Sequence, residues 1–404
     1  MPAPTPKSST TRLAQRIRRR REIITARPRL YVSIFLLALV VLTVLVRPFV
    51  VAHLQAIAVL DLVANKPVPP PLHWLVGERV TTTELTLPLP SGPVRARLYT
   101  PANHPNAPGF IVFHGVHYMG IDEPRLIAFA AAMSSCGLRV LTPELPNIKD
   151  YHVDASSIDT IVDSAKWLAH QNGDKPVGVM GLSFSGSLAL LAAAAPTFRP
   201  NIKFVVAIGA EDEMSRVAAY YRTGEDLRPN GTTELLAPHE YGALVLEYEN
   251  LEDFVPKPDL PALRAVLRAH LYEDPAAEQA ALAALTPAQT ATAKLLMDTT
   301  SPITRARLAA VETRHIQDMA GVSPHGHLAH MTTPVYLLHG EGDNIIPAAE
   351  TQWMTAELPS ETLQASLISP VLSHLDMDGK APGTMDNLRL VHFFALILHD
   401  AETR

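Results

Sequence analysis

The chain has 404 residues, with 34 basic and 40 acidic side chains and a formal charge of −6 at pH 7. Its 47% hydrophobic content permits a large buried core and is too high for a wholly disordered chain, despite 35 prolines. The single cysteine, Cys136, excludes an intramolecular disulfide framework and any multi-cysteine metal site. The mild acidity argues against a protein dominated by contacts with nucleic-acid phosphates.

The charge is divided unevenly along the chain. Residues 1–30 contain nine lysines and arginines and one acid, so they carry +8 and the other 374 residues carry −14. The run 30–46 has no charged residue and, as a helix of about 26 Å, would match the hydrocarbon core of a bilayer. We therefore predict a basic cytoplasmic arm at 1–29 and a single-pass anchor in the cell membrane at 30–50. Because basic flanks stay in the cytoplasm, the rest of the chain is predicted to be extracytoplasmic.

Three other interpretations of this N-terminal segment compete with the anchor. A cleaved signal peptide could end at the small-residue pairs Val50-x-Ala52 or Ala56-x-Ala58, but the basic region and the apolar run are both longer than usual for one. A buried core helix would show an amphipathic pattern, which the run lacks. The arginines at 18–21 could contact nucleic acid, yet beside an apolar run they favour a topology signal and anionic lipid. No nucleic-acid partner is expected.

The chain after the anchor divides into a linker, a core and an insertion. Residues 51–79 are predicted to be an amphipathic and proline-rich linker, because 65–71 reads Asn-Lys-Pro-Val-Pro-Pro-Pro. Short apolar strands then alternate with helical patterns over 80–212 and again over 331–404. The interval 213–330 is rich in alanine and leucine without strand alternation, so a helical cap insertion is predicted there.

The alternation predicts a doubly wound α/β fold with a mostly parallel, eight-stranded sheet. Two period-two runs joined by Pro90-Ser-Gly-Pro93 predict an antiparallel hairpin at its start, and later apolar runs predict strands buried on both faces. The expected strands are 80–89, 94–100, 109–115, 138–144, 176–181, 203–209, 334–340 and 363–369. The expected helices of the core are 124–135, 155–169, 184–195, 348–358 and 385–399.

The strongest chemical signal is a serine between a buried strand and a helix. The segment 176–186 reads Pro-Val-Gly-Val-Met-Gly-Leu-Ser-Phe-Ser-Gly, which puts Ser183 at the junction and Gly181 two residues before it. A sharp strand-to-helix turn exposes a serine hydroxyl and places helix N–H groups beneath it, as an activated nucleophile needs. The usual G-x-S-x-G pattern has a second glycine where this chain has Ser185, which leaves the tightness of the turn open.

Three further segments follow strands at the same expected edge of the sheet. His114-Gly115 ends the third strand, and a glycine turn there would let the Val116 N–H join the Phe184 N–H in a two-donor oxyanion hole. Asp343 lies in a glycine-rich turn after the seventh strand, where an acid could orient an imidazole. His374 lies in the loop before the last helix. This order of serine, aspartate and histidine follows strand ends, where parallel sheets carry their sites.

These motifs together resemble the α/β-hydrolase superfamily over about residues 80–400, with the insertion similar only to a generic helical cap. The resemblance implies that Ser183 is the nucleophile, His374 the general base and then acid, and Asp343 the acid that sets the imidazole tautomer. It also implies that 114–116 is the oxyanion strand end.

Alternatives remain within this constellation. Some members of the superfamily take their acid from the position of Glu211-Asp212, although the loop around Asp343 matches the motif better. Ser185 as nucleophile would lack the glycine two residues before it. His392 and His399 lie inside the last expected helix and are better explained as helix-face residues than as bases.

A zinc hydrolase is a competing class. His325-Gly-His327-Leu-Ala-His330 has histidine spacing similar to the H-x-H-x-D-H pattern of metallo-β-lactamase-like enzymes. Ala329 stands where that pattern needs aspartate, and the stretch comes late in the insertion. A polar loop is favoured, and no metal ligands are predicted.

The predicted reaction is hydrolysis of a carboxylic ester through an acyl-enzyme, which needs no cofactor or metal. A carboxylesterase or lipase is the first expectation, acting on a small-molecule or lipid-derived ester. A peptidase or thioesterase with the same triad is the nearest alternative, and a non-catalytic, membrane-tethered binding protein is another. His117, Tyr220 and Tyr221 are weaker candidates for substrate contact. Cys136 is expected to be a buried structural thiol.

Overall fold

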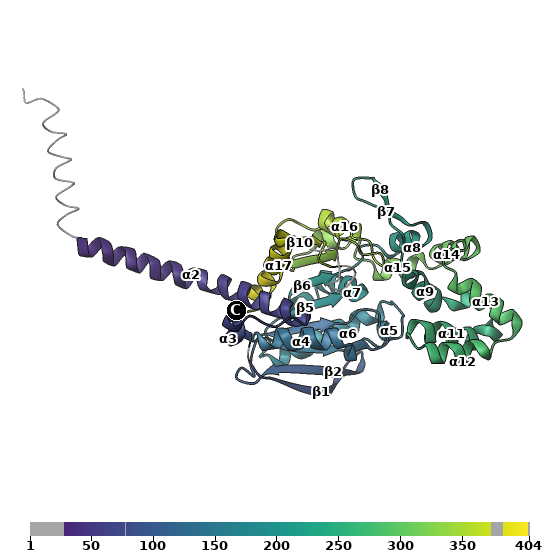
Figure 1. Ribbon diagram of the computed structural model, residues 1–404, viewed down its shortest axis with the longest axis horizontal. Helices are drawn as coiled ribbons and strands as arrows, with labels where there is room; N and C mark the ends of the chain where they lie inside the picture. The colour runs from purple at the N-terminus through teal and green to yellow at the C-terminus, as the bar shows by residue number, and fades with distance from the viewer. Residues whose placement is uncertain (1–27, 77, 373–382, 403–404) are drawn as a thin grey trace, which may run out of the picture. The chain divides into compact units, whose positions relative to one another are not determined.

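The computed structural model describes residues 28–76, 78–372 and 383–402 (Figure 1). The candidate base His374 and residues 1–27 of the basic arm lie outside the described residues. The chain divides into two compact units, residues 1–52 and residues 53–404.

An eight-stranded sheet forms the centre of residues 53–404. Its strand order is β1-β2-β4-β3-β5-β6-β9-β10; β2 is antiparallel to both neighbours, and the other adjacent pairs are parallel. The strands are β1 (Val80–Leu89), β2 (Gly92–Pro101), β3 (Gly109–Phe113), β4 (Arg139–Pro143), β5 (Val177–Leu182), β6 (Ile202–Ile208), β9 (Val335–Gly340) and β10 (Leu363–Ser369). The eight strands expected from the sequence are confirmed, including the hairpin of β1 and β2.

Helices cover both faces of this sheet, as continuously apolar central strands require (Figure 1). On one face, the ring of Phe129 on α4 packs against the ring of Phe394 on α17, with 6.2 Å between their centroids. Helices α6 and α7 also pack against each other. These helices are α4 (Pro124–Ser135), α5 (Pro146–Lys149), α6 (Ser156–Gln171), α7 (Phe184–Ala194), α16 (Ala349–Glu357) and α17 (Thr384–Glu402). The doubly wound α/β prediction is confirmed.

The segment between β6 and β9 is mainly helical. Its helices are α8 (Met214–Thr223), α9 (Glu240–Glu249), α10 (Leu251–Phe254), α11 (Leu260–Leu271), α12 (Pro275–Ala283), α13 (Pro287–Met297), α14 (Pro302–Arg314) and α15 (Ile316–Val322). The structure differs from the expectation in one respect, because β7 (Glu225–Leu227) and β8 (Thr233–Leu235) form a short antiparallel hairpin. Its turn is set by Gly231, at φ +79°, and by the Asn230 side chain, which accepts the Thr232 N–H at 3.0 Å.

The N-terminal apolar segment is one long helix, α2 (Pro28–Val63). The helix continues through Pro48, although a proline inside a helix removes a backbone hydrogen bond and crowds the preceding turn. The side chains of residues 31–50 are exposed. In residues 53–404, by contrast, the end of α2 is packed: Gln55 is 5% exposed and Ala56 is fully buried.

The packed end of α2 lies within residues 51–79, which the sequence predicts to be a linker. Gln55 Nε2 donates to the Cys136 carbonyl at 3.0 Å, which ties the helix to the end of α4. Residues 53–63 are therefore a structural part of the unit 53–404, because alternating alanines bring the helix close to its neighbours. The short helix α3 (His73–Val76) follows the proline-rich run and precedes β1.

We predict that Ala56→Phe lowers the free energy of unfolding by about 1–3 kcal/mol, because the added ring has no space at a fully buried position. The measurement is denaturant unfolding of the full chain in detergent, followed by circular dichroism. Ala38→Phe, on the exposed part of the same helix, is the matched control and should leave stability unchanged. Equal effects of the two substitutions would contradict the packing of residues 53–63.

Candidate active site

Ser183 lies in a sharp turn between β5 and α7. Its backbone has φ +56° and ψ −137°, a conformation that costs a non-glycine residue energy and persists only where the surroundings enforce it. The Ser183 N–H donates to the Ile208 carbonyl at 2.8 Å, which holds the turn against the end of β6. Ser183 is 3% exposed. The strained turn expected for an activated serine is therefore present.

Two glycines make this turn sterically possible. A Cβ on Gly181 would lie 2.3 Å from the Ser185 carbonyl oxygen, and a Cβ on Gly186 would lie 2.8 Å from the Ala210 Cβ. Contacts this short with backbone and packed side chains exclude any larger residue at either position. The small residues of the motif are explained by close approach of the strand and helix backbones.

Ser185, which replaces the second glycine of the motif, joins the turn to β3. It is fully buried, and its hydroxyl donates to the His114 carbonyl at 2.5 Å. The turn is as sharp as the motif requires. The Ser185 hydroxyl makes a hydrogen bond there that a glycine at this position could not make. With its hydroxyl engaged in this way, Ser185 is a structural residue and Ser183 is the better candidate nucleophile.

His114 is a structural residue at the end of β3. Its Nδ1 donates to the Gly115 carbonyl at 2.8 Å and its Nε2 accepts the Leu145 N–H at 2.9 Å. Complete burial lowers the pKa of His114 to about 4, so the ring is uncharged at neutral pH. Its two hydrogen bonds tie the ends of β3 and β4 together beside the serine turn.

The predicted oxyanion donors lie on adjacent parts of the sheet edge. Val116 follows β3, which pairs directly with β5, and Phe184 is the first residue of α7. The first N–H groups of a helix have no acceptor within the helix, so the Phe184 N–H can serve a ligand. The Val116 carbonyl accepts the Tyr241 hydroxyl at 2.8 Å. Their joint role as an oxyanion hole remains a prediction.

Asp343 is held in the loop after β9. It is 1% exposed, and its Oδ1 accepts the N–H groups of Ile345 and Ile346, each at 2.9 Å. Its Oδ2 lies 3.3 Å from Nε2 of the fully buried His339, which also bonds to the Ile346 carbonyl at 2.8 Å and to the Thr351 hydroxyl at 2.8 Å. His339 thus supports the carboxylate. The sequence signal for this role is that His339 is a polar residue at the end of an apolar strand.

The inserted segment contacts both loops that carry candidate residues. Tyr241, on α9, bonds to Val116, while the Tyr220 hydroxyl donates to the Asn344 carbonyl at 3.1 Å. The His239 N–H donates to the same carbonyl at 2.8 Å. None of these three hydrogen bonds could be predicted from the sequence, because the local pattern of an insertion does not show which distant loop it contacts. The insertion therefore positions the oxyanion loop and the acid loop together.

The weaker substrate candidates are occupied by packing contacts. Tyr220 and Tyr221 are each 2% exposed, and the Tyr221 ring lies against Gly242. His117 is half-buried and stacks on Tyr118, at 4.7 Å between ring centroids. Burial lowers the pKa of His117. A role for these three residues in substrate contact stays a prediction.

Glu211, the alternative acid, has a buried side chain. It is fully buried after β6, and neither carboxylate oxygen has a hydrogen-bond partner among the described residues. Burial raises the pKa of Glu211 well above its usual value. Burial also raises the pKa of the neighbouring Tyr221 well above its usual value. The environment favours a protonated Glu211, which makes it a poor candidate for an ionised acid.

The other alternative acid, Asp212, belongs to an ion-pair network. Its Oδ2 accepts from Arg216 at 2.9 Å and lies 3.0 Å from Nδ1 of His325, whose ring is 3.6 Å from Glu357. Burial raises the pKa of Asp212 to about 6. Asp212, His325 and Glu357 could in principle hold a metal ion. The Arg216 cation already occupies the same carboxylate oxygen, so the arrangement favours a structural network that joins α8 to α16 through Glu350.

Two further side chains from the sequence analysis have structural surroundings. Cys136 is 4% exposed, and burial raises the pKa of its thiol to about 12, so it is unreactive at neutral pH. His392 lies on α17, with its Nδ1 3.0 Å from Nε2 of His53. Both residues are distant in sequence from the serine turn at Ser183.

Comparison with known proteins assigns the fold to a family. The family model of the alpha/beta hydrolase family matches residues 107–376, more than half of the chain. The chain belongs to the alpha/beta hydrolase family. The match includes the Ser183 turn and the Asp343 loop and extends to residue 376.

Solved structures similar to this hydrolase include several esterases. An esterase of Pyrobaculum calidifontis is 17% identical, with 81% of this chain and 87% of that chain covered and a TM-score of 0.44. Carboxyl esterase 2 of Tuber melanosporum is 18% identical, covering 80% and 87%, with a TM-score of 0.44. A membrane phospholipase A described as a bacterial virulence factor is 14% identical, covering 90% and 97%, with a TM-score of 0.37. The comparison with curated proteins returned no match.

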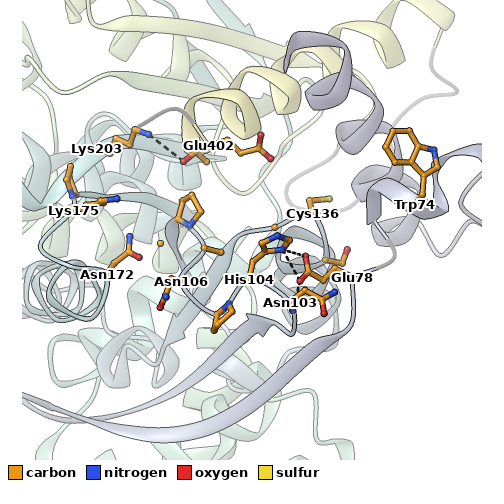
Figure 2. Close-up of a pocket in the computed structure, with 18 residues that line it drawn as sticks. Trp74, Glu78, Asn103, His104, Asn106, Cys136, Asn172, Lys175, Lys203 and Glu402 are labelled. Atoms are coloured by element: carbon orange, nitrogen blue, oxygen red, sulfur yellow. Dashed lines mark hydrogen bonds and ion pairs between the residues drawn. The ribbon is translucent and has the colours of Figure 1, made fainter. Parts of the chain in front are cut away.

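A hollow of about 930 Å³ lies at the other edge of the hydrolase sheet, where the strands begin (Figure 2). Gly109 at the start of β3 and Lys203 in β6 help to line it. Two of its charged groups have partners: Glu78 accepts from the His104 ring at 3.0 Å, and Lys203 donates to the Asp400 carbonyl at 2.5 Å. This hollow is separate from the serine turn.

We predict that Glu211→Gln makes the hydrolase progressively more stable than the wild type as the pH rises above about 4.5. Since burial raises the pKa of Glu211 in the folded state, the protonated carboxyl stabilises the fold at low pH, and this stability is lost as the pH rises toward the folded pKa. The difference should grow by at most about 1.4 kcal/mol per pH unit in that window.

The measurement is denaturant unfolding of both proteins from pH 4 to pH 8. The same substitution at the exposed Glu252 controls for the change in net charge. A constant difference between wild type and Glu211→Gln across this range would show that the buried carboxyl is not protonated in the folded state.

Proposed function

We propose that this hydrolase is a membrane-anchored serine esterase that cleaves carboxylic esters through an acyl-enzyme, with Ser183 as nucleophile, His374 as base and Asp343 as the orienting acid. The observation that carries the proposal is the strained turn at Ser183, packed on two glycines and tied to β3 by Ser185. Strain of this kind is retained where it positions a reacting group.

In the proposed reaction, the Ser183 hydroxyl attacks the ester carbonyl while His374 takes its proton. The oxygen of the tetrahedral intermediate accepts hydrogen bonds from the Val116 and Phe184 N–H groups. His374 then protonates the leaving alcohol, and water attacks the acyl-enzyme with the same histidine as base. The N–H groups of Ile345 and Ile346 bind Asp343 Oδ1, and Oδ2 faces His339. These contacts fix the direction of the carboxylate, as its proposed role in orienting His374 requires.

The proposed anchor is the exposed part of α2. Residues 31–63 form a helix long and apolar enough to cross a membrane, a test that a signal sequence also passes. A signal cut after Ala58 would remove the buried residues Gln55 and Ala56 from the folded unit, which argues against a cut at that site. With the basic arm in the cytoplasm, the hydrolase would lie on the extracytoplasmic side of the cell membrane.

The proposed substrate is a small-molecule or lipid-derived ester. An apolar hollow of about 120 Å³ lies at the carboxyl ends of β5, β6 and β9, and Leu182, the residue before Ser183, lines it. Apolar side chains beside a nucleophile suit the acyl part of an ester. Residues 213–330 would act as the cap that limits access, and the proposed chemistry needs no cofactor or metal.

We predict that a fluorophosphonate probe labels the wild-type chain and fails to label Ser183→Ala, because the probe reacts only with an activated serine hydroxyl. The measurement is in-gel fluorescence of membranes that contain the full chain. Ser185→Gly is the matched control: it removes the neighbouring hydroxyl and restores the usual motif, so labelling should persist. Labelling that survives Ser183→Ala, or is lost only in Ser185→Gly, would contradict the nucleophile assignment.

We also predict that Tyr241→Phe lowers kcat for a p-nitrophenyl ester by roughly 2- to 10-fold with little change in KM, as loss of one hydrogen bond to the oxyanion loop implies. Tyr272→Phe is the control, because it removes a hydroxyl that bonds to Asp150 and keeps the ring that stacks on Tyr118. If Tyr241→Phe raised KM at constant kcat, Tyr241 would be a substrate contact and not a positioning residue.

A further inference from the structure

A tyrosine with a left-handed backbone ends the short helix α5. The φ of Tyr151 is +64°, and its N–H donates to the Ile148 carbonyl at 3.2 Å. The His152 N–H donates to the Asn147 carbonyl at 2.8 Å. These two hydrogen bonds form the Schellman motif that ends many helices, in which glycine is the usual left-handed residue. A bulky residue at this position is strained and persists only where its surroundings enforce it.

The Tyr151 side chain joins two segments that are distant in sequence. It is fully buried, and its hydroxyl donates to the Leu271 carbonyl at 2.6 Å and accepts the Tyr118 N–H at 3.3 Å. Leu271 is the last residue of α11, where a carbonyl has no partner within the helix. Burial raises the pKa of Tyr151, so the hydroxyl keeps the proton that it donates. One hydroxyl therefore connects the inserted segment to the loop after β3.

The proposed oxyanion loop, residues 116–118, is held at two points of its backbone. The Tyr241 hydroxyl donates to the Val116 carbonyl at 2.8 Å. Two residues later, the Tyr118 N–H donates to the Tyr151 hydroxyl at 3.3 Å. The first contact comes directly from the insertion, and the second comes from the core but depends on the insertion through Tyr151. Both contacts therefore fix the residue whose N–H is the proposed oxyanion donor.

Aromatic packing supports the same connection. The Tyr118 ring stacks on the Tyr272 ring, with 5.1 Å between centroids, and the Tyr272 ring lies 5.7 Å from the Tyr151 ring. The Tyr151 ring also meets the Tyr241 ring edge to face, at 6.0 Å. Aromatic pairs of this geometry attract one another beyond the area that they bury. The loop after β3, the end of α5 and the insertion therefore meet around the Tyr151 side chain.

We propose that Tyr151 is a positioning residue for the esterase reaction, which holds the Val116 N–H in the oxyanion hole by tying the Tyr118 N–H to the end of α11. This inference rests on the proposed function. Glycine would form the same helix end without strain but has no hydroxyl to join the two segments. Because an oxyanion donor acts mainly on the charge that develops in the transition state, a loosened loop lowers kcat more than it raises KM.

The first test measures hydrolysis of a p-nitrophenyl ester by the full chain in detergent. Tyr151→Phe keeps the buried ring and removes the hydroxyl, so kcat should fall roughly 3- to 10-fold while KM stays within about twofold. Tyr336→Phe is the matched control, because Tyr336 is also buried and its hydroxyl donates to Asp400 on α17 at 2.5 Å. The control should leave both constants unchanged. A wild-type kcat in Tyr151→Phe, or a rise in KM alone, would overturn the proposal.

Tyr151→Gly separates the helix end from the side chain. Glycine suits the left-handed backbone, so the end of α5 is retained while the connection to Tyr118 and Leu271 is lost. We expect kcat to fall at least as far as in Tyr151→Phe. Wild-type activity in Tyr151→Gly would show that the tyrosine only ends the helix, and would overturn the proposal. If the glycine variant does not fold, Tyr151→Phe decides the question.

Hydrogen–deuterium exchange tests the loop itself, without any ester. Loss of the Tyr151 hydroxyl should speed exchange in the peptide that contains residues 116–118 by roughly 5- to 10-fold, because the Tyr118 N–H loses its acceptor. Tyr336→Phe should leave this peptide unchanged. Unaltered exchange in Tyr151→Phe would contradict the inference. Absence of ester hydrolysis by the wild-type chain would refute the esterase proposal instead, while the exchange measurement would still decide whether Tyr151 holds the loop.

Discussion

The strained backbone at Ser183 is the constraint on which the rest of the site depends. Its positive φ is stable only because Gly181 and Gly186 let the end of β5 and the start of α7 approach within contact distance. The Ser185 hydroxyl then joins this turn to the His114 carbonyl at the end of β3. One sharp turn therefore sets the positions of Ser183, the proposed nucleophile, of the first N–H groups of α7 and of the neighbouring loop at Val116.

The inserted segment adds a second layer of constraint. Tyr241 bonds to the loop that holds Val116, and Tyr220 bonds to the loop that holds Asp343. The insertion, expected from the sequence to act as a cap, therefore also holds the two loops that carry candidate site residues. Movement of the insertion during substrate entry would be transmitted to both loops at once, which links substrate access to the geometry of the proposed oxyanion hole.

The local parts of this architecture could be predicted from the sequence, and the long-range parts could not. Continuous apolar runs and the Gly181–Ser183 spacing identify the buried strands and the serine turn, because the physics of each is contained in a few consecutive residues. The buried Glu211, the support of Asp343 by His339 and the packing of α2 after residue 53 depend on which distant segments meet. Gln55 in an apolar helix carries no local sign that it bonds to Cys136.

The most direct test of the central claim is to trap the acyl-enzyme. The full chain is mixed with p-nitrophenyl acetate, quenched in acid within milliseconds, digested and examined by mass spectrometry. The account predicts an added acetyl group on the peptide that contains Ser183, with the acetyl group located on that residue by fragmentation. An acetyl group on Ser185 or on another residue, or complete turnover of the ester without any acylated peptide, would contradict it.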